Sequence, residues 1–187
     1  VEQEKTSPSN PPKSAEKPKK KTMEEALKNT IEKAGLFNLH QDTTSGKTYM
    51  LIKKTQLEKE FIHFVHGLNG QLNAGVFKGS YRGSKIFKLK KYFNRIEFEV
   101  QNNAMYFDPK NPLSRSSDAN VSSAILASSL IVSEKNNEYL IDVDNVFLTE
   151  SIHQISRGFI PGGVNKNPFK IGRLAKERTK YLEIKNY

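Results

Sequence analysis

"GSKIFKLKKYFNRIEFEVQNN", residues 83–103, is the stretch that decides the fold. If Phe93 and Asn94 are the central turn residues of a hairpin, the two arms pair lysines with glutamates on one face and apolar residues on the other. The expected partners are Lys88 with Glu99, Lys90 with Glu97, Phe87 with Val100 and Leu89 with Phe98. Each such cross-strand pair contributes roughly 0.2–1 kcal/mol. A nucleic-acid surface would need unpaired lysines with aromatic rings exposed among them, so the pattern favours a structural β-hairpin.

The charge is concentrated at the two ends of the chain. The 187 residues carry a formal charge of +10. Residues 1–21 hold six lysines against three acids, and residues 166–187 hold seven cations against two acids. The body between them, with 17 cations and 15 acids, is nearly neutral. A nucleic-acid-binding domain concentrates basic charge on its folded face, so this distribution argues against nucleic acid as a partner.

Several kinds of site and segment are missing from the sequence. The chain has no cysteine, which excludes disulfides, cysteine-ligated zinc and a cysteine nucleophile within it. No apolar run approaches the roughly 18 residues that span a bilayer. The first residues contain no apolar signal-peptide core. A chain that begins with Val1 is expected to have been processed or cut from a longer one.

The N-terminal quarter predicts a linker followed by one helix. Residues 1–21, rich in Pro, Lys, Ser and Glu, are predicted to be a disordered basic linker. Thr22 and Glu25 have the spacing of a capping box, and apolar residues then follow at helical intervals. The pattern predicts a helix over 23–34. We expect Gly35 to end it in the left-handed conformation, with Leu36 folding back on Ile31.

Strand signals dominate the rest. A hairpin is predicted over 37–52, and two strands are predicted around the turn "EKNN" at 134–137, followed by a short helical turn near 144–152. Residues 61–66 are apolar on both faces, which predicts a central strand covered on both sides. The sequence therefore indicates an α+β, strand-dominated domain over 22–165: one N-terminal helix and then an antiparallel β meander or sandwich. Residues 166–187 form a basic C-terminal segment, interpreted as a truncated continuation of the domain.

The histidines do not form a recognisable metal motif. His63 and His66 are three residues apart, and on a strand they point to opposite faces. His40 and His153 are isolated from any carboxylate pattern, and no H-E-x-x-H occurs in the chain. All four are interpreted as structural.

The other polar motifs are also incomplete. "DVDN", residues 142–145, lacks the glycine and closing glutamate of a calcium loop, so Asp142 and Asp144 are expected to face solvent or cap the following turn. The serines of "SRSSD" and "ASS" lie in no G-x-S-x-G elbow. "GGVNKNPFKIG" lacks the end of a phosphate-binding loop. No catalytic, cofactor-binding or metal residue is predicted in this chain.

The order of segments over about residues 33–160 resembles a known family. "GLF" leads into "K-x-Y-x-x-I", and a segment ending "L-x-K-E-F" introduces the next strand. "KIFKLKKYFNRIEF" is followed by "ILAS" and "YLIDV". This arrangement resembles the N-terminal domains of unknown function in large bacterial zinc-dependent metalloproteases.

The resemblance implies an accessory role. The parent enzymes are secreted or periplasmic peptidases with a downstream H-E-x-x-H-x-x-G-x-x-H zinc site, which this chain lacks, so no catalytic residue and no zinc ligand is transferred to it. The expected function is a non-catalytic accessory domain that packs on the catalytic domain of the same parent protein. The alternatives are a basic binding module for nucleic acid or an acidic surface and, with least support, a small stand-alone enzyme.

Overall fold

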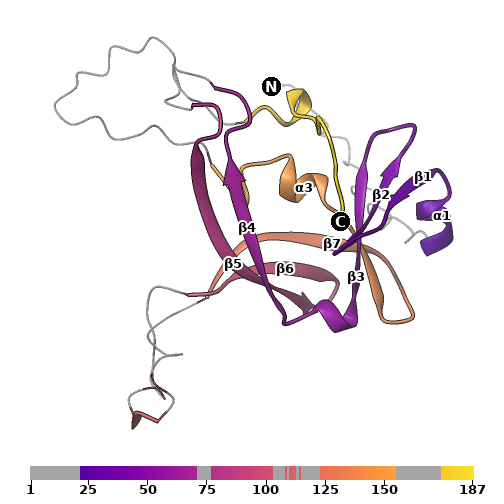
Figure 1. Ribbon diagram of the computed structural model, residues 1–187. Coiled ribbons are helices and arrows are strands. Elements are labelled where there is room, and N and C mark those ends of the chain that lie inside the picture. The colour runs from indigo at the N-terminus through magenta and orange to yellow at the C-terminus, as the bar shows by residue number, and fades with distance from the viewer. Residues whose placement is uncertain are drawn as a thin grey trace, which may run out of the picture.

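The computed structural model describes residues 22–70, 77–102, 108, 110–112, 114, 123–154 and 174–187. A short N-terminal helix precedes an eight-stranded antiparallel sheet that curls into a half-barrel (Figure 1). The α+β, strand-dominated fold class predicted from the sequence is confirmed. The elements are α1 Met23–Leu27, β1 Thr30–Lys33, β2 Asn38–Asp42, β3 Thr48–Lys53, η1 Lys54–Gln56, β4 Glu60–His66, β5 Tyr81–Tyr92, β6 Arg95–Val100, β7 Ala124–Lys135, β8 Glu138–Asp142, α3 Asp144–Phe147 and η4 Lys176–Arg178.

Two meanders make up the sheet, in the order β1-β2-β3-β8-β7-β6-β5-β4. Strands β1 to β3 form one meander and β4 to β8 the other. They join where β3 pairs with β8, while η1 carries the chain from β3 to the far edge strand β4. All the described strands belong to one curled sheet, so of the two predicted arrangements the meander is found.

The hairpin of β5 and β6 has the predicted register. Phe87 faces Val100, Leu89 faces Phe98, and the turn falls at residues 93 and 94. The side-chain ion pairs lie diagonally, however: Lys90 Nζ is 2.8 Å from the Glu99 carboxylate rather than bound to Glu97. The twist of adjacent strands brings diagonal neighbours within reach of long side chains.

The concave face of the half-barrel holds the core. Alternate residues of the central strands point into it, and α3 closes one end. Aromatic rings of β4, β5 and β6 continue it towards the open edge, with Phe61, Phe87 and Phe98 in successive contact. The buried members are Met50, Ile52, Leu89, Ile96, Phe98, Ala127, Ile131, Tyr139, Ile141, Val143, Val146 and Ile152.

The predicted helix over 23–34 is wrong in its second half. The capping box is present, because Thr22 Oγ1 accepts a hydrogen bond from Glu25 N and the Glu25 carboxylate accepts one from Thr22 N. The helix ends at Leu27, and residues 30–33 pair with β2 as strand β1. A full ladder of inter-strand hydrogen bonds outweighs the weak helical preference of this short stretch.

Gly35 does not cap a helix. It lies in the turn between β1 and β2 without a positive φ, and both Ile31 and Leu36 are exposed. The Asn186 side chain fills the space where a Cβ on Gly35 would lie. Its Nδ2 donates to the main-chain oxygens of Lys33 and Phe37, each at 2.6 Å. Gly35 therefore leaves room for the Asn186 side chain in its present position.

Strand β4 is not central, contrary to the prediction. It forms one edge of the sheet and pairs only with β5 among the described residues. Its inner residues are half-buried and its outer residues are exposed. The second apolar face, which suggested a strand covered on both sides, is instead an exposed apolar surface.

The described part of the C-terminal segment, residues 174–187, lies against the domain. Lys33 Nζ donates to the Ile184 oxygen at 2.9 Å, and Lys176 contacts the Asn145 side chain of α3. Figure 1 shows this segment running from η4 past α3 towards the N-terminal strands. The predicted linker 1–21 and the predicted boundary at 165 lie outside the described residues.

Candidate functional site

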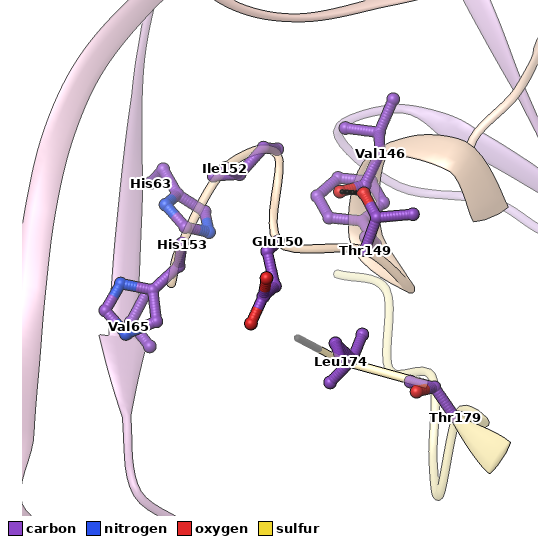
Figure 2. A pocket seen from close by; sticks show the side chains of 10 residues that line it. His63, Val65, Val146, Thr149, Glu150, Ile152, His153, Leu174 and Thr179 are labelled. Carbon is purple, nitrogen blue, oxygen red and sulfur yellow. Dashed lines mark hydrogen bonds between the residues drawn. The ribbon is translucent and has the colours of Figure 1, made fainter. Parts of the chain in front are cut away.

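A pocket of about 270 Å³ lies between the inner face of β4, the α3 region and the C-terminal segment (Figure 2). Strand β4 supplies one wall, the loop after α3 the second, and the start of the C-terminal segment the third. The pocket is mainly apolar with a few polar groups, which is the usual composition of a small-molecule site. Its lining residues are His63, Val65, Val146, Phe147, Thr149, Glu150, Ile152, His153, Leu174 and Thr179.

Two histidines from distant parts of the chain share this pocket. Figure 2 shows the imidazoles of His63 and His153 close together. Burial lowers the pKa of His63, and neighbouring His153 and Lys85 lower it further. Burial also lowers the pKa of His153, together with the charges of Arg82 and Lys85. Both rings are therefore biased towards the neutral form, in which each imidazole has one nitrogen to donate and one to accept.

The remaining polar groups of the pocket are of two kinds. The Glu150 carboxylate points towards the middle of the cavity (Figure 2), and the buried Nε2 of His153 has no hydrogen-bond partner among the described residues. The hydroxyls of Thr149 and Thr179 are occupied by main-chain acceptors, Asn145 and Ala175 respectively. The pocket thus directs one carboxylate, that of Glu150, into its cavity, whereas the His153 Nε2 is buried in the wall. No three His, Asp or Glu side chains in the described ranges lie close enough together to hold a metal ion.

His63 and His66 point to opposite faces of β4, as predicted. No sequence pattern links His153 to His63, because the two lie 90 positions apart and meet only through the curl of the sheet. His40 is buried on β2, and burial lowers its pKa. This placement agrees with its structural interpretation.

The two aspartates of "DVDN" support local structure. Asp142 Oδ1 accepts from the Asp144 N–H at 3.0 Å, and so helps to cap α3. Asp144 Oδ1 accepts from the Thr48 N–H at 3.2 Å and links α3 to β3. Burial raises the pKa of Asp144 and also that of Tyr181, whose hydroxyl lies beside the same carboxylate. The predicted capping role holds, and the predicted solvent exposure does not, because the Asp142 side chain is largely buried.

The predicted serine motifs contribute no assembled nucleophile within the described residues. Ser129 Oγ donates to the Asp142 main-chain oxygen at 2.8 Å and ties β7 to β8. Most of "SRSSD" and all of "GGVNKNPFKIG" lie outside the described residues.

The largest departure from the sequence prediction is an apolar area that we call the β4–β5 outer patch, formed by Ile62, Phe64 and Tyr81. These side chains are 72%, 57% and 56% exposed. The Phe64 ring lies 5.2 Å from the Tyr81 ring, centroid to centroid, so the patch is contiguous. The apolar second face of β4 was the signal for it in the sequence.

Four cations of the hairpin, Lys88, Lys90, Lys91 and Arg95, lie beside carboxylates. Lys88 Nζ lies 3.4 Å from Glu60, and Lys91 Nζ lies 3.2 Å from Glu134. Arg95 pairs with Glu97 at 2.6 Å. This face does not offer the row of unpaired cations that binding to a phosphate backbone needs.

Comparisons with known proteins returned no family model, no curated protein and no solved structure that matches this chain significantly. In the part of the chain that the structure describes, no helix has the length and apolar character needed to cross a membrane.

Proposed function

We propose that this chain is a non-catalytic accessory domain of a bacterial zinc-dependent metalloprotease, and that it packs on the catalytic domain through the β4–β5 outer patch. In this proposal the zinc and its ligands belong to the catalytic domain, and the protein works in the periplasm or outside the cell. The observation that carries the proposal is the exposure of Ile62, Phe64 and Tyr81 on one sheet face.

The chemistry of the patch supports a protein partner. Contiguous exposed apolar area on a soluble domain marks an interaction site more often than isolated apolar residues do. Aromatic residues are enriched at the centres of such interfaces. Ion pairs such as Glu60 with Lys88 lie beside the patch and can form a polar rim. The resemblance of residues 33–160 to metalloprotease N-terminal domains supplies the identity of the partner.

The test uses this chain and the peptidase domain of the same reading frame, expressed as two polypeptides. We expect them to co-purify, and we expect Phe64→Lys to weaken binding by about tenfold or more, as truncation of an interface anchor does. Leu130→Lys is the matched control, since Leu130 is also exposed but lies on another strand, β7.

Two results would overturn the proposal. One is a reading frame that encodes no H-E-x-x-H-x-x-G-x-x-H domain. The other is zinc-dependent hydrolysis of casein by this chain alone. A salt-sensitive gel shift with DNA or RNA at about 50 mM salt would instead support the alternative, a basic binding module.

A further inference from the structure

We propose that the open edge of β4 pairs with β4 of a second copy of this chain, antiparallel and about a two-fold axis that passes beside His63. This pairing would use the main chain of β4, whereas the β4–β5 outer patch uses side chains on the sheet face. The inference goes beyond the proposed function and rests on the main-chain edge of β4, while Ile62 and Phe64 of the outer patch set its register.

The direction of the β5 main-chain groups is fixed by two hydrogen bonds. Gln101 N donates to the Ile86 oxygen at 2.8 Å, so even-numbered residues of β5 direct their main-chain groups towards β6. Glu58 N donates to the Leu89 oxygen at 3.0 Å, so odd-numbered residues direct theirs towards β4. This alternation is the rule in antiparallel sheets.

The same alternation identifies the main-chain groups at the β4 edge. Phe61 pairs with Phe87 and His63 pairs with Lys85, so odd-numbered residues of β4 bond to β5. The N–H and C=O groups of Ile62 and Phe64 therefore point away from β5, where no described strand lies beside them. Natural proteins usually block such edges with charged residues, prolines or covering loops.

The β4 sequence is complementary to itself in one register. In an antiparallel pair centred on His63, Ile62 lies opposite the partner's Phe64, and Glu60 lies opposite the partner's His66. The two-fold axis repeats both pairs. Ile62 and Phe64 thus find an apolar neighbour, and the Glu60 carboxylate, which also pairs with Lys88, finds an imidazole that can donate a hydrogen bond to it. Such mutual pairing is what an isologous dimer interface requires.

This register is also the longest that the main chain allows. The groups at the open edge belong to even-numbered residues, so only even-numbered residues can form the hydrogen-bonded pairs. A shift of two residues in either direction keeps that rule but shortens the ladder and separates Glu60 from the partner's His66. We therefore assign the occupant of this edge to a second copy rather than to an unrelated strand.

The first test is the mass of the chain in solution, measured by light scattering coupled to size exclusion from micromolar to millimolar concentration. We expect a concentration-dependent doubling of the 21.2 kDa mass. Phe64→Pro should restore the monomer mass, because it removes an edge N–H and leaves the bonds to β5 intact. Circular dichroism establishes whether this variant is folded.

The second test determines the register in which the two β4 strands pair. No native cysteine interferes with it, because the chain has none. His63→Cys should form a disulfide-linked dimer on mild oxidation. At this non-hydrogen-bonded position the two Cα atoms are about 4.5 Å apart, within the disulfide range. His66→Cys is the matched control and should not cross-link, because its counterpart lies at the opposite end of the paired strands.

The outcomes separate clearly. A mass that stays at the monomer value over the whole concentration range overturns the proposal. A dimer in which His66→Cys cross-links as readily as His63→Cys also overturns it, because the interface would then have another register. The cross-linking result stands even if Phe64→Pro does not fold.

Discussion

His63 illustrates how neighbours that are remote in sequence set the chemistry of one residue. Its position on β4 places it on the inner face, and the curl of the sheet brings His153 to it. Lys85 lies opposite it on β5 and donates to the Ile152 main-chain oxygen at 3.0 Å, which holds the cationic group in this region. The lowered pKa of His63 follows from burial first and from these two neighbours second.

Stability should therefore decrease on acidification. The pKa of His63 in the folded protein lies below the usual value of about 6.5, so the unfolded chain binds more protons as the pH falls through that value. The loss of unfolding free energy begins near pH 6.5 and levels off below the folded pKa. We expect His63→Gln to make this decrease shallower, measured by urea unfolding between about pH 7.5 and 5.

His66→Gln is the control for this measurement, since His66 is exposed on the opposite face of the same strand. Asp144 has a raised pKa and acts in the opposite direction at lower pH, but it is present in both variants and cancels from the comparison. Equal pH slopes for the His63→Gln variant and the unmodified chain would contradict the prediction.

At the scale of elements, the hairpin of β5 and β6 shows which of its two faces stabilises it. Leu89 is completely buried in the core, whereas its neighbour Lys90 is partly exposed and paired with Glu99. Loss of a buried leucine side chain costs about 2–5 kcal/mol, and partly exposed ion pairs contribute about 0–1 kcal/mol. The apolar face therefore carries most of the stability.

The corresponding prediction compares two neighbouring substitutions. Leu89→Ala should lower the free energy of unfolding by about 2–5 kcal/mol. Lys90→Ala should lower it by at most about 1 kcal/mol. Chemical denaturation of both variants checks this. A larger loss for Lys90→Ala than for Leu89→Ala would mean that the ion pairs, rather than the core, hold the hairpin together.

The same hairpin shows why part of the fold could be predicted. Its two arms are adjacent in sequence, and both faces encode one register, so local pattern was sufficient. The pattern over 23–34 was ambiguous, because residues 30–33 satisfy a helical period and also a strand that needs β2 as its partner. For β4, two apolar faces are compatible with a central strand and with an edge strand that carries an exposed patch.

The candidate site was less predictable than the fold, because its residues meet only through long-range packing. His153 reaches His63 from the loop after α3, and Tyr181 reaches Asp144 from the C-terminal segment. None of these pairs has a sequence spacing that would indicate contact. The resemblance to metalloprotease domains gave an expected role but no residues for a site.

At the scale of the whole molecule, the C-terminal segment joins the two ends of the described chain. Asn186 Nδ2 bridges the main-chain oxygens of Lys33 and Phe37, and Gly35 leaves the space that the Asn186 side chain fills. A hydrogen bond of this kind contributes about 0.5–1.5 kcal/mol. The turn between β1 and β2 is thus stabilised by Asn186, a residue that does not belong to the β1–β2 hairpin.

This arrangement predicts non-additive substitutions. Gly35→Ala should destabilise the protein by about 1–3 kcal/mol, because the new Cβ displaces Asn186. Asn186→Ala should cost about 1–3 kcal/mol through two lost hydrogen bonds. The double variant should be less destabilised than the sum of the two, as measured by urea unfolding. Strict additivity would show that Gly35 matters for a reason other than Asn186.

The hydrogen bonds made by Asn186 can form only late in the synthesis of the protein on the ribosome. Lys33 and Phe37, which carry the two accepting oxygens, are translated early. Asn186, which carries the donor, follows Lys33 by 153 positions. At about 5–20 residues per second, that interval lasts roughly 8–30 s. Strand β8 follows its neighbour β3 by 85 to 93 positions, from Lys53 with Glu138 to Tyr49 with Asp142. During synthesis the edge of β3 therefore stays unpaired until β8 has been made.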